Sequence, residues 1–244
     1  MEKIILIETS TALCSAALAE DGAITSYRES SAPKAHASLT AVFIQEMLQE
    51  RGLTLTDCDA VCVSMGPGSY TGLRVGVSTA KGLCFGSGKP LLAVGTLDTL
   101  VSQASTVIPS EVGVTDRVAE ADANESHTYK FIIPMIDARR MEVYTAVFED
   151  GRQITETAPA IIDETSFAEY LEQGPCLFIG DGAGKCADVI KHPNAHFCHC
   201  WPKASSMLAP ALAAFRAGDF KDVAYFEPFY LKEFVATVSK KKMW

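Results

Sequence analysis

The sequence predicts an α/β protein built from two copies of one lobe. Residues 7–22 (IETSTALCSAALAEDG) and 136–151 (IDARRMEVYTAVFEDG) match without a gap, and both end in Glu-Asp-Gly, a hairpin-turn signal. Each copy is followed by more strand, a helix, an apolar strand and a glycine-rich loop that opens a helix. The chain has 244 residues, 48% of them hydrophobic, which is enough for two lobes with a core each.

The first copy opens with a predicted three-stranded unit and a helix. The apolar strand 3–7 is followed by a strand at 15–20, and an Asp-Gly turn leads from it into a third strand. The helix is predicted to run from Ser38, which can cap its start, to Arg51, because a glycine follows directly. Its apolar positions are Leu39, Val42, Phe43 and Met47.

A glycine loop separates the next strand from the longest predicted helix. Ala60–Ser64 is predicted as a buried strand that runs into the loop Gly66–Gly72, and an apolar, small-residue helix then extends to Gly86. Leu91–Val94 is the following strand, and Thr96 can cap another helix.

An acidic stretch, Ser110–Ser126, interrupts this regular pattern. It contains five acidic residues and one arginine, has no clear period, and is predicted to be a solvated loop or connecting arm. A strand resumes at Tyr129–Ile136, where Pro134 suggests a sheet edge or a bulge. The second copy then has the strand Cys176–Ile179 and the glycine loop Gly180–Gly184.

Charge and cysteine usage exclude several classes of protein. The net charge of −9 argues against a large basic nucleic-acid surface. No apolar run approaches the ~20 residues of a membrane span, and Ile4–Ile7 ends at Glu8, so no signal peptide is expected. Eight cysteines without a CxxC pair predict reduced thiols in the cytoplasm. We expect the basic tail Lys240–Lys242 to be solvated.

Five metal-ligand side chains gather within nine residues near the end of the second copy. In an extended segment Cys198 and Cys200 face one way and His199 the other, so no closed structural site forms. The spacing matches no familiar zinc pattern, and we expect no metal. The cluster consists of His192, His196, Cys198, His199 and Cys200.

Small residues recur at every fourth position of the helix after the first glycine loop. Glycine inside a helix costs about 1 kcal/mol relative to alanine, so the close approach of another backbone is implied. That backbone can belong to the sheet of the same lobe, or to another subunit that also contacts the helix Ser38–Arg51. The pattern leaves both open. The stripe consists of Gly68, Gly72, Gly76, Ala80 and Cys84.

Each copy places an acidic residue, Glu8 or Asp137, at the end of its first strand. Two such turns that face each other can hold a phosphate and its Mg²⁺ between two lobes, as in the actin-like ATPases and sugar kinases. Alternatively, the turns survive as scaffold and the cleft binds nothing. The loop Gly66–Gly72 fits neither a Walker A nor a Rossmann pattern, and Ser69 within it does not form a GxSxG nucleophile elbow.

Several longer motifs resemble those of the TsaB (YeaZ) family. They are IETSTALCSAAL, GPGSYTGLRVGVSTAKGL, PLLAVGTLDTL, IDARRMEVY and PFYLKEF. The resemblance is dense over Ile4–Leu100 and resumes at Ile136–Tyr144 and Glu227–Phe234. It implies an actin-like ATPase (ASKHA, ribonuclease H-like) fold of two duplicated lobes. The implied parts are a first lobe at 1–100, a second at 101–224, and a C-terminal segment at 225–244 that can pack back on the first.

The resemblance also implies a function. TsaB acts in the synthesis of threonylcarbamoyladenosine at position 37 of tRNA, where its paralogue TsaD carries the catalytic site and TsaE supplies an ATPase. TsaB pairs with TsaD through helices of its first lobe and can self-associate through the same surface. The resemblance therefore implies TsaD and TsaE as partners, tRNA contact only through the complex, and no membrane. It implies no cofactor of its own, with ATP or ADP at the subunit junction left open.

Two positions separate this chain from the catalytic paralogue. Where TsaD has a His-x-x-x-His metal pair, Thr96 and Leu100 stand here, and together they make no metal site. Glu8 stands where actin-like ATPases usually have Asp, and its extra methylene would displace a tuned carboxylate. Both differences favour a degenerate, non-catalytic subunit without catalytic residues or metal.

We expect the helices 38–51 and 72–86 to bind the partner, and Gly76→Leu to abolish pairing without unfolding the monomer. The expected contact residues are Leu39, Phe43, Gly72, Arg74, Gly76, Val77, Ala80 and Lys81. The expected vestigial phosphate loops contain Glu8, Ser10, Thr11, Gly66, Gly68, Ser69, Asp137, Gly180 and Gly182.

Two other functions stay open. An active ATPase or small-molecule kinase would use Glu8, Asp137 and the loops Gly66–Ser69 and Gly180–Gly184, and binding of Mg-ATP tighter than ~100 µM would support it. The second alternative is a glycoprotease-like peptidase. The missing metal histidines and the missing catalytic triad argue against it.

Overall fold

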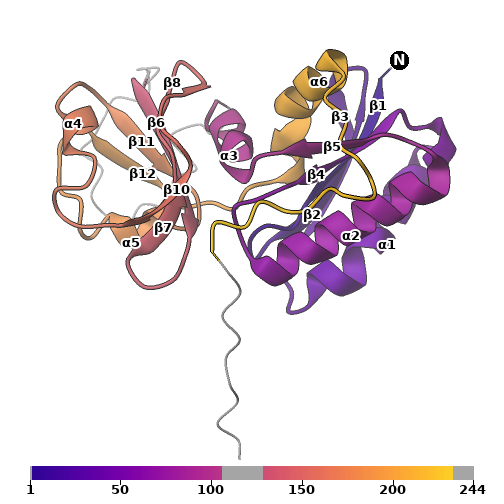
Figure 1. Cartoon of the computed structure of the whole chain (residues 1–244), viewed down its shortest axis with the longest axis horizontal. Helices are drawn as coiled ribbons and strands as arrows, with labels where there is room; N and C mark the ends of the chain where they lie inside the picture. Colours follow the sequence, from indigo (N-terminus) through magenta and orange to yellow (C-terminus); the bar gives the residue numbers. More distant parts are fainter. Residues whose placement is uncertain (1, 106–128, 233–244) are drawn as a thin grey trace, which may run out of the picture.

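A computed structural model describes residues 2–105 and 129–232, which form two lobes (Figure 1). The first lobe contains β1 (Lys3–Glu8), β2 (Cys14–Glu20), β3 (Ala23–Ser30), α1 (Ala35–Glu50), the 3-10 turn η1 (Leu55–Asp57), β4 (Ala60–Ser64), α2 (Tyr70–Ser87) and β5 (Leu91–Val94). Its sheet has the order β3-β2-β1-β4-β5, with β1 antiparallel to β2 and parallel to β4. Helices α1 and α2 cover one face of this sheet.

The second lobe repeats this plan. It contains β6 (Phe131–Asp137), β7 (Glu142–Thr145), β8 (Phe148–Glu149), β9 (Arg152–Gln153), β10 (Ala158–Ile161), α4 (Ala168–Leu171), β11 (Cys176–Ile179), α5 (Ala183–Cys186) and β12 (Ala195–Cys198). Its sheet has the order β10-β7-β6-β11-β12, and the short hairpin β8–β9 is joined to β6. Helices α4 and α5 share one core on one face of the sheet.

The predicted duplication is confirmed by the topology. Strands β10, β7, β6, β11 and β12 take the places that β3, β2, β1, β4 and β5 take in the first lobe. The two matching turns also share their backbone conformation: φ is 51° and 80° at Asp21 and Gly22, and 49° and 73° at Asp150 and Gly151. Positive φ at both central residues is the hairpin geometry that suits the right-handed twist of strands.

The central residues of β1, Ile4–Ile7, are all apolar because both faces of the first sheet are covered. Ile5 and Ile7 pack beneath α1 and α2, whereas Ile4 and Leu6 pack in a second core on the opposite face. All four side chains are fully buried. Alternate residues of a strand face opposite sides, so a sheet between two helical layers needs a continuous apolar run.

Both main helices of the first lobe begin earlier than the sequence pattern suggests. Helix α1 begins at Ala35, and the expected cap Ser38 lies inside it, with its hydroxyl donating to the carbonyl of Lys34 at 3.1 Å. Helix α2 begins at Tyr70, because the Ser69 hydroxyl caps it by accepting a backbone N–H of the first turn at 3.3 Å. The last residues of the glycine loop are therefore helical.

Helices near the lobe boundaries pack across the divisions at residues 100 and 224. Helix α3 (Thr96–Ala104) buries Leu97 and Leu100 in a core shared with the second sheet. The 3-10 turn η3 (Ala204–Met207) and helix α6 (Leu208–Ala217) return to the first sheet, where Met207 and Leu212 fill the core opposite α1 and α2. Helix α3 thus follows the first lobe in the sequence but packs on the second sheet, and α6 follows the second lobe but packs on the first. Helix α3 lies between the two lobes (Figure 1).

Pro134 lies in the interior of the second sheet rather than at an edge. Strand β6 has β11 on one side and both β8 and β7 on the other. Its antiparallel pairing with β8 ends at Ile132, and its pairing with β7 begins at Met135. The proline lies in this interval, where no antiparallel hydrogen bond requires a backbone N–H, which proline lacks.

Residues 218–232, which we name the C-terminal strap, run back over the first lobe and then to the second (Figure 1). The backbone N–H of Phe229 donates to the carbonyl of Met65 at 2.7 Å, and Lys81 of α2 donates to the carbonyls of Ala224 and Phe226 at 3.0 and 3.1 Å. These bonds fix the strap along one side of α2.

The acidic stretch Ser110–Ser126 and the tail Lys240–Lys242 lie outside the described residues. Among the helices of residues 2–105 and 129–232, none has the length and hydropathy needed to cross a bilayer.

Candidate functional site

The turn after β1 is buried beneath the loop that leads into α2. Glu8 is fully buried, and its Oε1 accepts hydrogen bonds from the Ser10 backbone N–H at 2.6 Å and from the Ser64 hydroxyl at 2.9 Å. Burial raises the pKa of Glu8 to about 7, because its hydrogen bonds offset only part of the desolvation. The protonated and the ionised form of this buried carboxyl group are therefore both populated near neutral pH.

Five side-chain oxygens in this region find no hydrogen-bond partner among the described residues. Their residues are at most 6% exposed, so these oxygens are enclosed within the lobe. A phosphate or Mg²⁺ site needs such groups to line an open cradle. The oxygens are Glu8 Oε2 and the hydroxyls of Thr9, Ser10, Thr11 and Thr96.

The glycine stripe presses directly on this turn. A Cβ atom on Gly68 would collide with the carbonyl of Ser10, and a Cβ on Gly72 or Gly76 would collide with Thr9. The stripe therefore brings α2 onto the sheet of its own lobe, and the expectation that these glycines admit a partner helix is corrected. The backbone of the turn and that of the glycine loop are therefore in direct contact, with no room for a side chain between them.

The other residues expected at the partner surface are mostly turned inward as well. Leu39 is half-buried against the first core, Lys81 reaches the C-terminal strap, and only Arg74 is exposed. The sequence pattern located the two helices but not the face that points outward, because small and apolar residues mark the face against the sheet. The fully inward members are Phe43, Val77 and Ala80.

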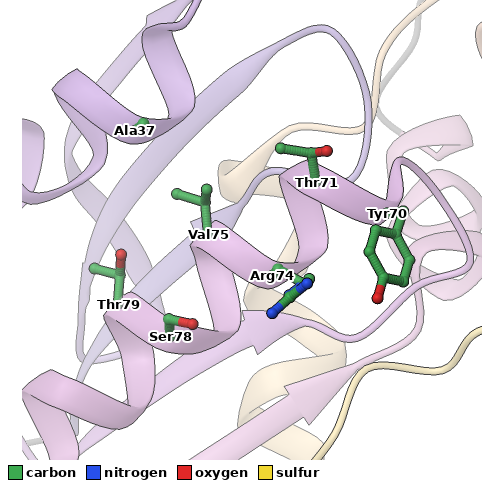
Figure 2. Close-up of a pocket in the computed structure, with 7 residues that line it drawn as sticks. All are labelled: Ala37, Tyr70, Thr71, Arg74, Val75, Ser78 and Thr79. Atoms are coloured by element: carbon green, nitrogen blue, oxygen red, sulfur yellow. The ribbon is translucent and has the colours of Figure 1, made fainter. Parts of the chain in front are cut away.

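The outward faces of α1 and α2 border an open groove of about 550 Å³ (Figure 2). Residues on the outward face of α2, opposite the glycine stripe, line the groove together with Ala37 of α1. The guanidinium of Arg74 lies over the ring of Tyr70, 5.5 Å from its centroid. Short side chains elsewhere leave room for a second helix to approach. The lining residues are Ala37, Tyr70, Thr71, Arg74, Val75, Ser78 and Thr79.

The C-terminal strap builds one end of this groove. Tyr230 packs against Tyr70, with ring centroids 4.8 Å apart and ring planes tilted by 35°. Gly66 makes room for the strap, because a Cβ there would lie 2.8 Å from the carbonyl oxygen of Phe229. Further along the outward side of α2, Phe85 is 88% exposed. A large exposed ring beside a helical groove is typical of a protein-binding surface.

The corresponding turn of the second lobe is open to solvent. Asp137 is exposed and forms an ion pair with Lys185 of α5, and its backbone N–H donates to Asp181 at 2.9 Å. Burial raises the pKa of Asp181. The next two exposed residues, Arg139 and Arg140, have left-handed φ angles of 73° and 50°. Two cations thus stand where the first lobe has buried hydroxyls.

The loop Gly180–Gly184 also packs on its own sheet. A Cβ atom on Gly180 would collide with the carbonyl of Met135, and one on Gly182 would lie 2.9 Å from the side chain of Val143. In both lobes the glycines serve the close approach of a loop to a strand, which is the packing use of glycine in strands and turns.

The positions compared with a metal pair hold structural side chains. The backbone N–H of Thr96 donates to the carbonyl of Gly66 at 2.9 Å, and Leu100 is fully buried in the core beneath α3. In the His/Cys cluster, Cys198 and Cys200 lie side by side, as the extended geometry predicts. A hydrogen bond with Cys200 lowers the pKa of the Cys198 thiol. Within residues 2–105 and 129–232, no three His, Cys, Asp or Glu residues are placed to hold a metal ion.

The duplicated strand order, the shared helix between the lobes and the paired acidic turns define an actin-like ATPase fold whose phosphate-loop positions are packed rather than open. Two solved structures from Pseudomonas aeruginosa share this fold. The structure described as YeaZ has a TM-score of 0.75 and 25% identity, covering 95% of this chain and 100% of that chain. Another, described as similar to peptidase YEAZ, has a TM-score of 0.78 at 24% identity, with the same coverage.

Sequence relatives are found along the whole chain. A family model described as TsaD, tRNA N6-adenosine threonylcarbamoyltransferase, matches residues 29–175. The Escherichia coli K12 protein named tRNA threonylcarbamoyladenosine biosynthesis protein TsaB is 30% identical over 242 residues, 96% of each chain. The TsaB protein of Haemophilus influenzae is 35% identical over 141 residues, 58% of this chain and 51% of that one. This chain belongs to the TsaB (YeaZ) family.

Proposed function

We propose that this chain is a non-catalytic accessory subunit in the synthesis of tRNA threonylcarbamoyladenosine. Relatives of matching length are named for that pathway. The first-lobe turn at Glu8 is sealed by the loop and helix above it, and the metal-pair positions hold Thr96 and Leu100. A protein that keeps the fold and has filled its phosphate-loop region is suited to hold a catalytic partner.

The observation that carries the proposal is the groove between α1 and α2. It presents short side chains along two turns of α2, a cation held over an aromatic ring, and an exposed phenylalanine on the same helix. An amphipathic helix pair fits such a surface, because short side chains let backbones approach. We assign this groove to TsaD, with TsaE and tRNA joining through the complex. The net charge of −9 is unfavourable for direct tRNA contact.

The same groove offers a route to self-association. Two copies could face each other across α1 and α2 in an isologous contact, and TsaD would then compete with the second copy. We also place the protein in the cytoplasm, because all eight cysteines are free and seven of them are buried.

Light scattering on the purified chain, alone and mixed with TsaD of the same organism, tests the proposal. We expect a one-to-one complex with the wild-type chain. Ser78→Trp, which places a large side chain in the groove from α2, is expected to weaken pairing at least tenfold, about 1.4 kcal/mol. Asp188→Trp, on an exposed loop of the second lobe, is the matched control and is expected to pair normally. Normal pairing by a folded Ser78→Trp protein would refute the assignment of the groove.

We propose that the chain alone holds no nucleotide. The backbone contacts between Gly68, Gly72 and the turn after β1 support this, since they leave no room for another group between the loop and the turn. Isothermal titration with Mg-ATP checks it. Binding tighter than about 100 µM by the lone chain would instead favour an active ATPase or kinase.

A further inference from the structure

A second cavity, of about 330 Å³, lies in the second lobe between the paired strands β7 and β10 and helix α4. Its floor comes from residues of one parity on the two strands, since Thr145 pairs with Ala158 and Val143 with Ala160. Val143 packs in the core that α4 covers, so Thr145 faces the same layer. The two alanines are too short to reach α4, and this leaves the hollow.

The hydroxyl of Thr145 is the polar group of this floor. Thr145 is 6% exposed and lines the cavity, and its Oγ1 has no hydrogen-bond partner among the described residues. A buried hydroxyl without a partner is costly, and a donor group of a ligand would relieve that cost.

The walls carry aromatic rings and carboxylates. Phe167 and Tyr170 border the cavity from α4 and the residue before it, and Glu156 and Glu169 stand on the rim. No lysine or arginine is among its lining residues. The rings are held by neighbours: Phe167 meets Phe178 edge-on at 5.5 Å, and Tyr170 meets another phenylalanine edge-on at 5.1 Å. Aromatic faces with nearby carboxylates attract organic cations.

We propose that this cavity binds a small alkylammonium compound. The ammonium group lies between the carboxylates of Glu156 and Glu169 and donates to the free hydroxyl of Thr145. The alkyl chain lies on the alanine floor against the ring of Phe167. The volume is at the small end of ligand pockets and suits a short chain. The site is separate from the groove between α1 and α2 and does not depend on the function proposed for that groove.

An NMR titration of the full chain with three probes of equal length tests the chemistry. n-Butylammonium chloride, 1-butanol and sodium butyrate are added at constant ionic strength. We expect n-butylammonium to saturate shifts around Thr145 and Tyr170 with a Kd of roughly 1–10 mM. We expect 1-butanol to bind at least tenfold more weakly and butyrate not to bind. Equal affinity for n-butylammonium and 1-butanol, or no saturation, would overturn the proposal.

Variants then locate the contacts. Glu156→Gln combined with Glu169→Gln is expected to weaken n-butylammonium binding at least tenfold without changing that of 1-butanol. Thr145→Val is expected to weaken it about threefold, and Ala158→Leu to abolish it by filling the hollow. The matched control is Glu172→Gln, an exposed carboxylate outside the lining, which should keep wild-type affinity. Full binding by a folded double glutamine variant would also refute the assignment.

Discussion

The two acidic turns occupy the same place in a duplicated lobe and have opposite environments. In the first lobe Glu8 is fully buried, and the residues after it carry hydroxyls that α2 and its loop cover. In the second lobe Asp137 is exposed, pairs with Lys185, and is followed by Arg139 and Arg140 in left-handed conformations. Strand order and hairpins are alike in both lobes, so the difference comes from what packs above each turn.

What packs above each turn is a long helix in one lobe and a short one in the other. Helix α2 has 18 residues and lays its glycine stripe over the turn, whereas α5 has four and leaves Asp137 uncovered. A duplicated backbone therefore tolerates opposite chemistry at equivalent positions. The first turn has become part of a core, and the second has remained a surface.

The largest effect is expected from overfilling the seal of the first lobe. Gly76→Leu is expected to lower the free energy of unfolding by about 3 kcal/mol or more, because its side chain collides with Thr9. Urea denaturation measures it. Gly82→Ala on the outward side of α2, where a Cβ meets nothing within 4 Å, is the control and should stabilise by about 1 kcal/mol. A stable, folded Gly76→Leu protein that fails only in partner binding would restore the earlier assignment of the stripe.

A somewhat smaller effect is expected from the titration of Glu8. Its pKa rises from 4.5 in the unfolded chain to about 7 in the folded one, so the folded state binds more protons between these values. Stability is therefore fully present below about pH 4.5 and falls as pH rises through 7. From pH 5 to 8 the loss is about 2–3 kcal/mol. The free energy of unfolding, taken from denaturation curves at each pH, should depend less on pH in Glu8→Gln than in the wild type.

The equivalent, exposed turn of the second lobe supplies the control for the pH experiment. Asp137→Asn removes the equivalent carboxylate from the second lobe and is expected to leave the wild-type slope between pH 5 and 8. If the Glu8→Gln protein kept that slope, Glu8 would not be the titrating group, and the buried environment described for it would be wrong.

The smallest effect concerns the backbone of the second turn. Arg139→Gly is expected to stabilise the fold by about 0.5 kcal/mol, because relief of a left-handed non-glycine residue slightly exceeds the entropy that glycine adds to the unfolded chain. Thermal unfolding measures the shift. Arg152→Gly, in the extended strand β9, should destabilise instead. Destabilisation by Arg139→Gly would show that the arginine side chain itself holds the turn.

Much of this architecture follows from the sequence. The repeat, both Asp-Gly hairpins and the strands from Lys3 to Val94 depend on local conformational preference and on apolar runs, which adjacent residues express directly. The family motifs likewise identify the fold, because they cover the strands and loops of the first lobe. The glycine stripe also predicted that another backbone approaches α2 closely.

Only the tertiary structure decided what the stripe approaches and which lobe each helix joins. Helical periodicity shows that Gly72, Gly76 and Ala80 share a face, but the partner of that face is a turn some sixty residues earlier in the chain. The return of α6 to the first sheet and the burial of Glu8 are likewise long-range events. The groove beside Arg74 and the hollow at Thr145 exist because neighbouring elements leave them uncovered. Local sequence patterns do not show which elements pack beside a residue, so they predict neither cavity.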